Sequence, residues 1–252
     1  MMDLLHEQKP KIVKAEDSEK LARKALSLFI DSACKAIDAR GVFYVAISGG
    51  HTPAIFYELL SEESAYSRID WRKVHLFWVD ERCVPPSAEA SNFGLAAHTF
   101  LLDVPIPGEN VHRVTGEDTN YAQAAKEYEQ IILNVFGLKP GQLPRFDLLM
   151  LGMGADGHIG SVLPNTNALF HTKSLVTAVY RMDADFSRIT LTVPVFKEAE
   201  EIFILVSGQS KAEIVREVFR SEPDEFKYPV HFLWPIMNKV TWIMDQHAAA
   251  LL

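Results

Sequence analysis

Cysteine is scarce in this chain of 252 residues. Only Cys34 and Cys83 are present, which is too few for a disulfide framework or a structural zinc site. A reducing intracellular compartment is the simplest setting for such a composition. The low cysteine content therefore excludes the disulfide-stabilised and zinc-stabilised classes of small protein.

Long apolar segments and an excess of positive charge are also missing. The amino-terminal stretch 1–16 is polar, and no uninterrupted apolar run is long enough for a signal peptide there or for a membrane span elsewhere. Lys and Arg total 25 against 33 Asp and Glu, a formal net charge of −8, which argues against a nucleic-acid surface. We expect a soluble cytoplasmic protein without nucleic-acid or membrane partners, in which a local cluster of donors would hold any anionic substrate.

No internal repeat, low-complexity tract or linker rich in Pro, Gly and Ser interrupts the sequence. Hydrophobic residues make up 48% of the chain and charged residues 23%, an ordinary globular composition. The length is compatible with one large α/β domain or two small ones. Because nothing marks a boundary, we expect a single α/β domain, 1–252.

Apolar periodicity and turn residues divide the chain into strands that alternate with helices. This alternation indicates parallel βαβ units and a layered α/β fold, with a mostly parallel sheet and helices on both faces. Thr52 is expected to cap the second helix and Pro53 to begin it. Expected helices cover 18–39, 54–60, 91–101, 121–136, a segment ending at 219, and 245–252; expected strands cover 42–47, 74–79, 111–114, 146–151, 174–180, 188–193, 201–206 and 239–245.

The most informative stretch runs from Phe146 to Ser161. An apolar strand is followed by Gly152, Gly154 and Gly157, which permit positive φ and close approach of backbone N–H groups to a ligand. Asp156 and His158 follow the strand directly, where α/β sheets place their ligand crevice. An isolated histidine could equally cap a helix or fill a polar corner, but this combination favours a catalytic imidazole oriented by a carboxylate.

Two other strands end in residues suited to chemistry. The run Ser48-Gly-Gly-His-Thr-Pro53 links a strand to a helix amino terminus, where unpaired N–H groups and the helix dipole attract phosphate. It is neither a Walker loop nor a dinucleotide fingerprint, so a nucleotide is not indicated; a plain βα turn is the alternative. Asp80-Glu-Arg82 puts three charges behind another strand, although the solvated start of a loop would look the same. These loops can share one rim of the sheet.

The motifs taken together resemble the 6-phosphogluconolactonases of the glucosamine-6-phosphate isomerase/6-phosphogluconolactonase family. The resemblance runs from about Val42 to the carboxyl terminus and implies the Rossmann-like fold of sugar-phosphate isomerases and deaminases. The motifs that carry it, in chain order, are Ser48-Gly-Gly-His-Thr-Pro53, Asp80-Glu-Arg82 with Val84-Pro85 and Ser91-Asn92, Leu151-Gly-Met-Gly-Ala-Asp-Gly-His158 with Ser161 and Pro164, Arg188-Ile-Thr-Leu-Thr192, Gly208 with Lys211-Ala212, and Val240-Thr-Trp-Ile-Met-Asp245-Gln-His-Ala-Ala.

The resemblance implies hydrolysis of 6-phospho-D-glucono-1,5-lactone to 6-phosphogluconate, the second step of the oxidative pentose phosphate pathway, without a metal or organic cofactor. The partner is then a small phosphorylated sugar lactone, and the protein a monomer or small homo-oligomer. We expect His158 to act as general base, with Asp156 or Asp80 orienting it. Arg82 and the glycine-rich backbone, including Gly152 and Gly154, are candidates for stabilising the oxyanion. The candidates for phosphate binding are Ser48, Gly49, Gly50, His51, Thr52, Arg188 and Lys211.

The sequence also departs from the family patterns. Ile159 after the histidine is more typical of the deaminase branch, but that branch continues with Phe-Asn-Glu-Pro, and Ser161, Val162 and Leu163 stand in those places. The deaminases also have Asp-Glu-Tyr where this chain has Asp80-Glu-Arg82. His51 is unusual where a small hydroxyl residue is common. A glucosamine-6-phosphate deaminase and a non-catalytic sugar-phosphate-binding regulator are therefore the alternatives.

Overall fold

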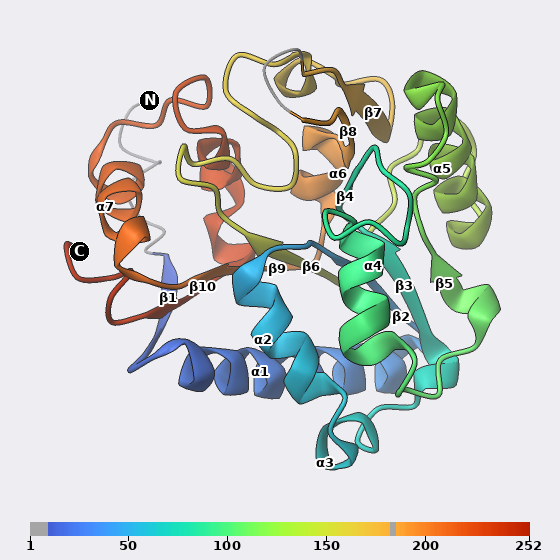
Figure 1. Ribbon diagram of the computed structural model, residues 1–252, viewed down its shortest axis with the longest axis horizontal. Helices are drawn as coiled ribbons and strands as arrows, with labels where there is room; N and C mark the ends of the chain where they lie inside the picture. The colour runs from blue at the N-terminus through green and yellow to red at the C-terminus, as the bar shows by residue number, and fades with distance from the viewer. Residues whose placement is uncertain (1–9, 182–184) are drawn as a thin grey trace.

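The computed structural model describes residues 10–181 and 185–252, so the first part of the expected polar amino-terminal stretch lies outside the described residues. Its centre is a seven-stranded, fully parallel sheet in the order β1-β10-β9-β6-β2-β3-β5 (Figure 1). The expected α/β class with a mostly parallel sheet is thereby confirmed. The strands are β1 (Lys11–Ala15), β2 (Phe43–Ile47), β3 (Val74–Trp78), β5 (Val111–His112), β6 (Leu148–Gly152), β9 (Glu201–Val206) and β10 (Val240–Asp245).

Helices cover both faces of this sheet, as neighbouring side chains of β2 show. Phe43 meets Phe29 of α1 (Ser18–Arg40), with ring centroids 5.6 Å apart. Tyr44 stacks at 4.2 Å on Phe136 of α5 (Tyr121–Phe136). Because successive side chains of a strand point to opposite faces, α1 and α5 lie on opposite sides. The remaining helices are α2 (His51–Leu60), α3 (Glu63–Tyr66), α4 (Asn92–Ala96), α6 (Val193–Glu198) and α7 (Ala212–Arg220), with short helical turns at η2 (Trp71–Lys73), η3 (Ala97–Leu101), η4 (Gly108–Asn110), η5 (Asn167–Leu169), η6 (Gln209–Lys211) and η7 (Pro229–Lys239).

A second, antiparallel sheet has the order β4-β8-β7 and stands beside the carboxyl end of β3. Its strands are β4 (Asp80–Arg82), β8 (Arg188–Leu191) and β7 (Val176–Val179). Sequence patterns predicted β7 and β8 as strands but not their separate sheet, and they treated Asp80–Arg82 as a loop. The pairing of β4 with β8 places Arg82 directly opposite Arg188.

Strand order explains where a ligand can bind. From β2 the chain adds β3 and β5 on one side, and from β6 it adds β9 and β10 on the other. The order therefore reverses between the neighbouring strands β2 and β6, which creates a crevice at their carboxyl ends. The loops after β2, β3, β6 and β9 meet at this edge, as the sequence predicted.

Several sequence expectations were wrong in detail. Strand β1 was not predicted, and the last residues after Asp245 form turns rather than a helix. Helix α2 begins at His51 with Gly50 at its cap position, so Thr52 lies inside the helix. Ser91 caps α4, and its hydroxyl oxygen accepts a bond from the N–H of Gly94. The αL glycines Gly41 and Gly137 end α1 and α5.

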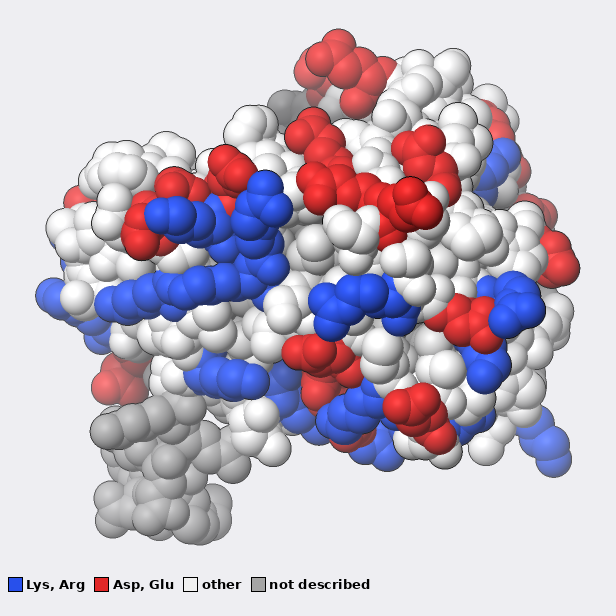
Figure 2. All heavy atoms as spheres, turned by 90° about the horizontal axis from the view of Figure 1, so that it is seen from below, with Lys and Arg blue, Asp and Glu red and all other residues white. Residues whose placement is uncertain are grey.

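The outer surface carries charges of both signs. Figure 2 shows Lys and Arg interspersed with Asp and Glu on the face that is seen from below. Several surface charges form local pairs, such as Arg23 with Glu19 on α1 and Arg72 with Asp70. Within residues 10–181 and 185–252, no helix is long and apolar enough to cross a membrane.

Candidate active site

A cleft of about 390 Å³ opens at the carboxyl edge of the parallel sheet, where the loops after β2, β3, β6 and β9 meet. Every candidate site residue named from the sequence lines it except Asp156, which contacts His158. The sequence-predicted residues in its wall are Ser48, Gly49, Gly50, His51, Thr52, Asp80, Arg82, Gly152, Gly154, His158, Arg188 and Lys211.

His158 is held by Asp156 on the loop that follows β6. Nδ1 of His158 lies 2.5 Å from Oδ1 of Asp156, and the same oxygen accepts the His158 backbone N–H at 3.2 Å. Burial raises the pKa of Asp156, but the hydrogen bonds and charge of His158 outweigh it and lower that pKa to about 2. The carboxylate is thus ionised at neutral pH and can only accept, so Nδ1 carries the proton. Nε2 is then the imidazole nitrogen with a lone pair for chemistry.

Gly154 makes this arrangement possible by having no side chain. A Cβ there would lie 2.2 Å from both Cε1 and Nδ1 of His158 and 2.7 Å from Oδ1 of Asp156. The Gly154 N–H also donates to the His158 carbonyl at 2.8 Å, which closes the loop on itself. Gly157, between the two functional residues, has φ +78° and lies against Tyr228. The glycines of this motif thus shape the loop around the imidazole.

Asp80 lines the cleft, but its hydrogen-bond partners are residues other than His158. Its Oδ2 accepts the Ser161 hydroxyl at 2.6 Å, and its backbone carbonyl accepts the Asn92 amide at 2.8 Å. In the described part of the chain, no hydrogen bond joins it to His158. Of the two carboxylates that the sequence left open as partners of the imidazole, Asp156 is the one in contact.

Glu81 points away from the cleft and organises the turn into α4. Its buried carboxylate accepts the backbone N–H groups of Arg82, Asn92 and Phe93 at 2.7 to 2.8 Å and the Ser91 hydroxyl at 3.1 Å. Burial raises the pKa of Glu81, against these backbone hydrogen bonds. Glu81 therefore stabilises the turn beside the site.

Arg82 and Arg188 present two guanidinium groups to the cleft from opposite positions of β4 and β8. Nη1 of Arg82 donates to the Ala90 carbonyl at 2.6 Å, which fixes the side chain. Among the described residues, the buried Nε atoms of both arginines have no hydrogen-bond partner. Since directly opposed like charges repel, an anion in the cleft would stabilise the pair.

Lys211 reaches the cleft from the far side, at the end of η6. Its Nζ donates to the Met153 carbonyl at 2.7 Å, on the loop that carries His158. Burial lowers the pKa of this ammonium, and nearby Asp156 opposes that effect. The cleft thus combines the imidazoles of His51 and His158 with three cationic side chains, a suitable environment for an anionic substrate.

The turn after β2 supplies the amino terminus of α2. Gly50, at φ +114°, occupies the cap position, and among the described residues no side chain caps this end. Backbone N–H groups there remain available to a ligand. The buried Ser48 hydroxyl likewise has no partner within the described chain. Thr52 instead bonds to Ser207 at 2.9 Å, linking α2 to the loop after β9.

Eight residues in the wall were not among the site residues predicted from the sequence: Pro53, Asn92, Met153, Gly160, Leu205, Val206, Ser207 and Ser210. Asn92 is the most consequential, because its Oδ1 would lie only 1.8 Å from a Cβ at position 49. That contact explains why Gly49 must be glycine. The Ser91-Asn92 pair stood out in the sequence as part of a motif, but only the fold brings it beside Gly49. Over the residues that the structure covers, no group of three or more His, Cys, Asp or Glu could hold a metal ion.

Comparison with known proteins gives consistent results. The profile of the family described as glucosamine-6-phosphate isomerases/6-phosphogluconolactonase matches residues 16–242. A 6-phosphogluconolactonase of Nostoc sp. is 36% identical over 234 residues, covering 93% of this chain and 95% of the relative. The structure of 6-phosphogluconolactonase from Trypanosoma cruzi superposes with a TM-score of 0.84 at 26% identity, covering 97% of each chain. A monomeric glucosamine-6-phosphate deaminase shares the fold, with a TM-score of 0.78 at 20% identity, covering 96% of this chain and 100% of that one.

Proposed function

Because the chain belongs to the glucosamine-6-phosphate isomerase/6-phosphogluconolactonase family, we propose that it acts as a 6-phosphogluconolactonase. It hydrolyses 6-phospho-D-glucono-1,5-lactone to 6-phospho-D-gluconate in the oxidative pentose phosphate pathway. Similarity to named lactonases over nine-tenths of the chain supports the reaction. The contact between Asp156 and His158 in a cationic cleft is the observation that carries the mechanism.

In this mechanism, His158 is the general base. Nε2 removes a proton from a water molecule as its oxygen attacks the lactone carbonyl carbon, and a tetrahedral oxyanion forms. When the bond from that carbon to the ring oxygen breaks, the imidazolium returns the proton to the ring oxygen. Asp156 holds the required tautomer and stabilises the imidazolium through the 2.5 Å contact at Nδ1.

The cationic side chains meet the two remaining requirements, oxyanion stabilisation and phosphate binding. Arg82, fixed by its bond to the Ala90 carbonyl, stabilises the oxyanion together with backbone N–H groups of the glycine-rich loop. One such donor is worth about 3 kcal/mol of transition-state stabilisation. Arg188 and Lys211, with the Ser48 to Thr52 turn at the start of α2, bind the phosphate. An anchor away from the reacting carbonyl positions the lactone for attack.

The deaminase alternative lacks support at a specific place. The acid that deaminases carry after the catalytic histidine falls within Ser161, Val162 and Leu163 in this chain. Ser161 is completely buried and bonded to Asp80, while Val162 and Leu163 are buried in the apolar core. The cleft therefore receives no carboxylate from this segment. A regulator that binds sugar phosphates without turnover would have no use for the paired Asp156 and His158.

Two assays on the purified protein test the proposal. One measures hydrolysis of freshly generated 6-phosphogluconolactone, corrected for spontaneous ring opening, and the other measures ammonia release from glucosamine-6-phosphate. Lactone turnover without ammonia is the expected result. Ammonia without lactone turnover would mean a deaminase, and binding of 6-phosphogluconate without either activity would mean a regulator.

The proposal extends to the organisation of the protein. We treat the chain as a single α/β domain, supported by one connected hydrophobic core that includes residues from Ala15 to Ala249. We place it in the cytoplasm, where the free thiols of Cys34 and Cys83 would persist. As its quaternary state we propose a monomer or small homo-oligomer, which sedimentation velocity would determine.

A further inference from the structure

We propose that Asp245, the last residue of β10, is a positioning residue that fixes Lys211 at the cleft and thereby sets the affinity for the phosphorylated substrate. Asp245 does not line the cleft itself. The inference rests on the proposed function, because it assigns a role to a residue that acts through the phosphate-binding Lys211.

Asp245 is a buried carboxylate whose partners are backbone N–H groups. Only 2% of the Asp245 surface is exposed to solvent. The Gly208 N–H lies 3.1 and 2.9 Å from its two oxygens, and the Ala248 N–H lies 2.7 Å from Oδ1. Among the described ion pairs, none includes Asp245. A buried charge without a cation depends on such hydrogen bonds, so this contact fixes the turn at Gly208 firmly.

The turn at Gly208 leads directly to Lys211. Gly208 has φ +92°, a backbone conformation that other residues rarely adopt, and it is the cap residue of η6. Its carbonyl accepts the Lys211 N–H at 3.0 Å. The residue before it, Ser207, is bonded to Thr52 at the start of α2. Asp245 therefore fixes a turn that has one attachment to α2 and ends in the cationic side chain.

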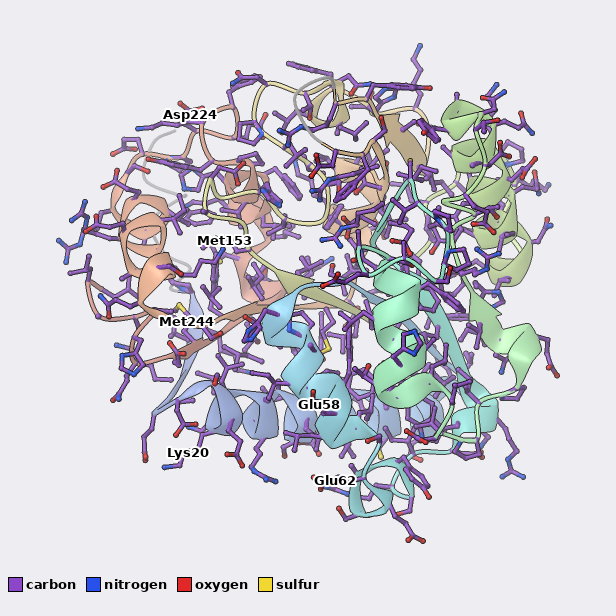
Figure 3. All side chains as sticks on the ribbon, in the orientation of Figure 1. Lys20, Glu58, Glu62, Met153, Asp224 and Met244 are labelled. Atoms are coloured by element: carbon purple, nitrogen blue, oxygen red, sulfur yellow. The ribbon has the colours of Figure 1, made fainter. Side chains whose placement is uncertain are left out.

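Lys211 is also bonded to the loop that carries the general base. Its Nζ donates to the Met153 carbonyl, next to Gly154, whose N–H donates to the His158 carbonyl. Figure 3 labels both Met244, which precedes Asp245, and Met153, and shows them in the left half of the view. A continuous series of hydrogen bonds thus joins the end of β10 to the loop after β6.

Asparagine at position 245 would break this series with little change in shape. An amide offers one acceptor oxygen and one NH₂ donor, so the donor would face the N–H of Gly208 or Ala248. A buried N–H without an acceptor moves or takes up water, and the Gly208 turn would loosen. Lys211 would then be held less well for phosphate, while His158 and Asp156 would stay paired.

The test compares Asp245→Asn with Asp147→Asn. Asp147 is a matched control because it is also buried, is bonded to Arg40, and accepts a backbone N–H, from Tyr44 at 2.8 Å, but lies at the other end of the sheet. We expect Asp245→Asn to raise KM for the lactone about tenfold with kcat nearly unchanged. Asp147→Asn should lower the melting temperature without changing KM. Equal KM values for the two variants would overturn the inference.

A double-mutant cycle separates positioning from general loosening. In a Lys211→Ala background, Asp245→Asn should raise KM no further, because the residue through which it acts is gone. Additive effects on KM would contradict the proposal. If Asp245→Asn does not fold, Gly208→Ala replaces it in the cycle, since the space there is open and only the positive φ is strained.

Binding of 6-phosphogluconate, measured by calorimetry, keeps this inference distinct from the proposed function. Weaker binding by Asp245→Asn, together with wild-type protein that shows no lactone turnover, would refute the lactonase activity and leave the positioning role standing. Normal lactone turnover in the wild type with unchanged binding in Asp245→Asn would refute the positioning role alone.

Discussion

Oδ1 of Asp156 and Nδ1 of His158 lie 2.5 Å apart, two residues from each other along the chain and separated only by Gly157. The contact is local, yet it needs the surrounding fold, because Gly157 adopts a positive φ against Tyr228 and Gly154 leaves room for the imidazole. Nε2, which bonds to none of the described residues, is thereby left to the cleft. The first predictions test this relationship.

Replacing His158 by alanine should lower kcat by about 100- to 10,000-fold, the usual contribution of a general base. KM should change little, because the proposed phosphate contacts are made elsewhere. Steady-state kinetics on the lactone would measure both, with His98→Ala as the control, since His98 is exposed and lies outside the cleft. A His158→Ala enzyme that kept full activity would exclude the general-base role.

Gly154→Ala should also lower kcat, by about 100-fold, although it removes no functional group. The new methyl group would overlap the His158 ring and displace the imidazole from the attacking water. Gly108→Ala is the control, because nothing lies within 4 Å of a Cβ there and its φ is not positive. If both variants were equally active, the close approach at Gly154 would not matter for catalysis.

Arg82→Ala and Arg188→Ala should differ in which kinetic constant they change. Loss of an oxyanion donor at position 82 should lower kcat by about 100-fold. Loss of a phosphate contact at position 188 should instead raise KM roughly 10- to 100-fold. Unphosphorylated glucono-1,5-lactone serves as a second substrate, and Arg188→Ala should reduce the preference for the phosphorylated lactone. The reverse pattern would exchange the two assigned roles.

Asp156 should make stability depend on pH in the acid range. Its pKa is lowered to about 2 in the folded protein, against an ordinary value of 3.8. A carboxylate with a lowered pKa stabilises the fold fully above its ordinary pKa, and this contribution is lost as the pH falls through the folded value. Urea unfolding of the wild type and Asp156→Asn should therefore show a stability difference that is constant above about pH 4 and shrinks toward pH 2. A difference independent of pH would show that the ionised carboxylate is not the cause.

The sequence determined the parts of this protein whose signals are local. The bounds of α5 were predicted correctly because its amphipathic pattern stops at Gly137, which ends the helix in the αL conformation. Strand β9 was likewise predicted correctly, from a short apolar run between polar residues. The four site loops could be placed on one edge because each follows a parallel strand, and parallel strands end on the same side.

The tertiary structure alone decided what depends on distant partners. Asp80–Arg82 is polar enough to look like a loop, but it forms a strand because β8, more than 100 positions away, pairs with it. Strand β1 similarly exists through its pairing with β10. The expected terminal helix is replaced by turns in which Asp245 accepts the Ala248 N–H. Propensity over a few residues does not report such pairings, since the stabilising hydrogen bonds come from elsewhere in the chain.

The different roles of the acidic residues show the same limit of prediction from sequence. Sequence patterns placed Asp80, Glu81 and Asp156 near the cleft but could not assign their partners. The fold commits Asp80 to Ser161 and Glu81 to the turn before α4, which leaves Asp156 with His158. A carboxylate's role follows from which donors reach its oxygens, and those donors are set by packing between segments that are distant in sequence.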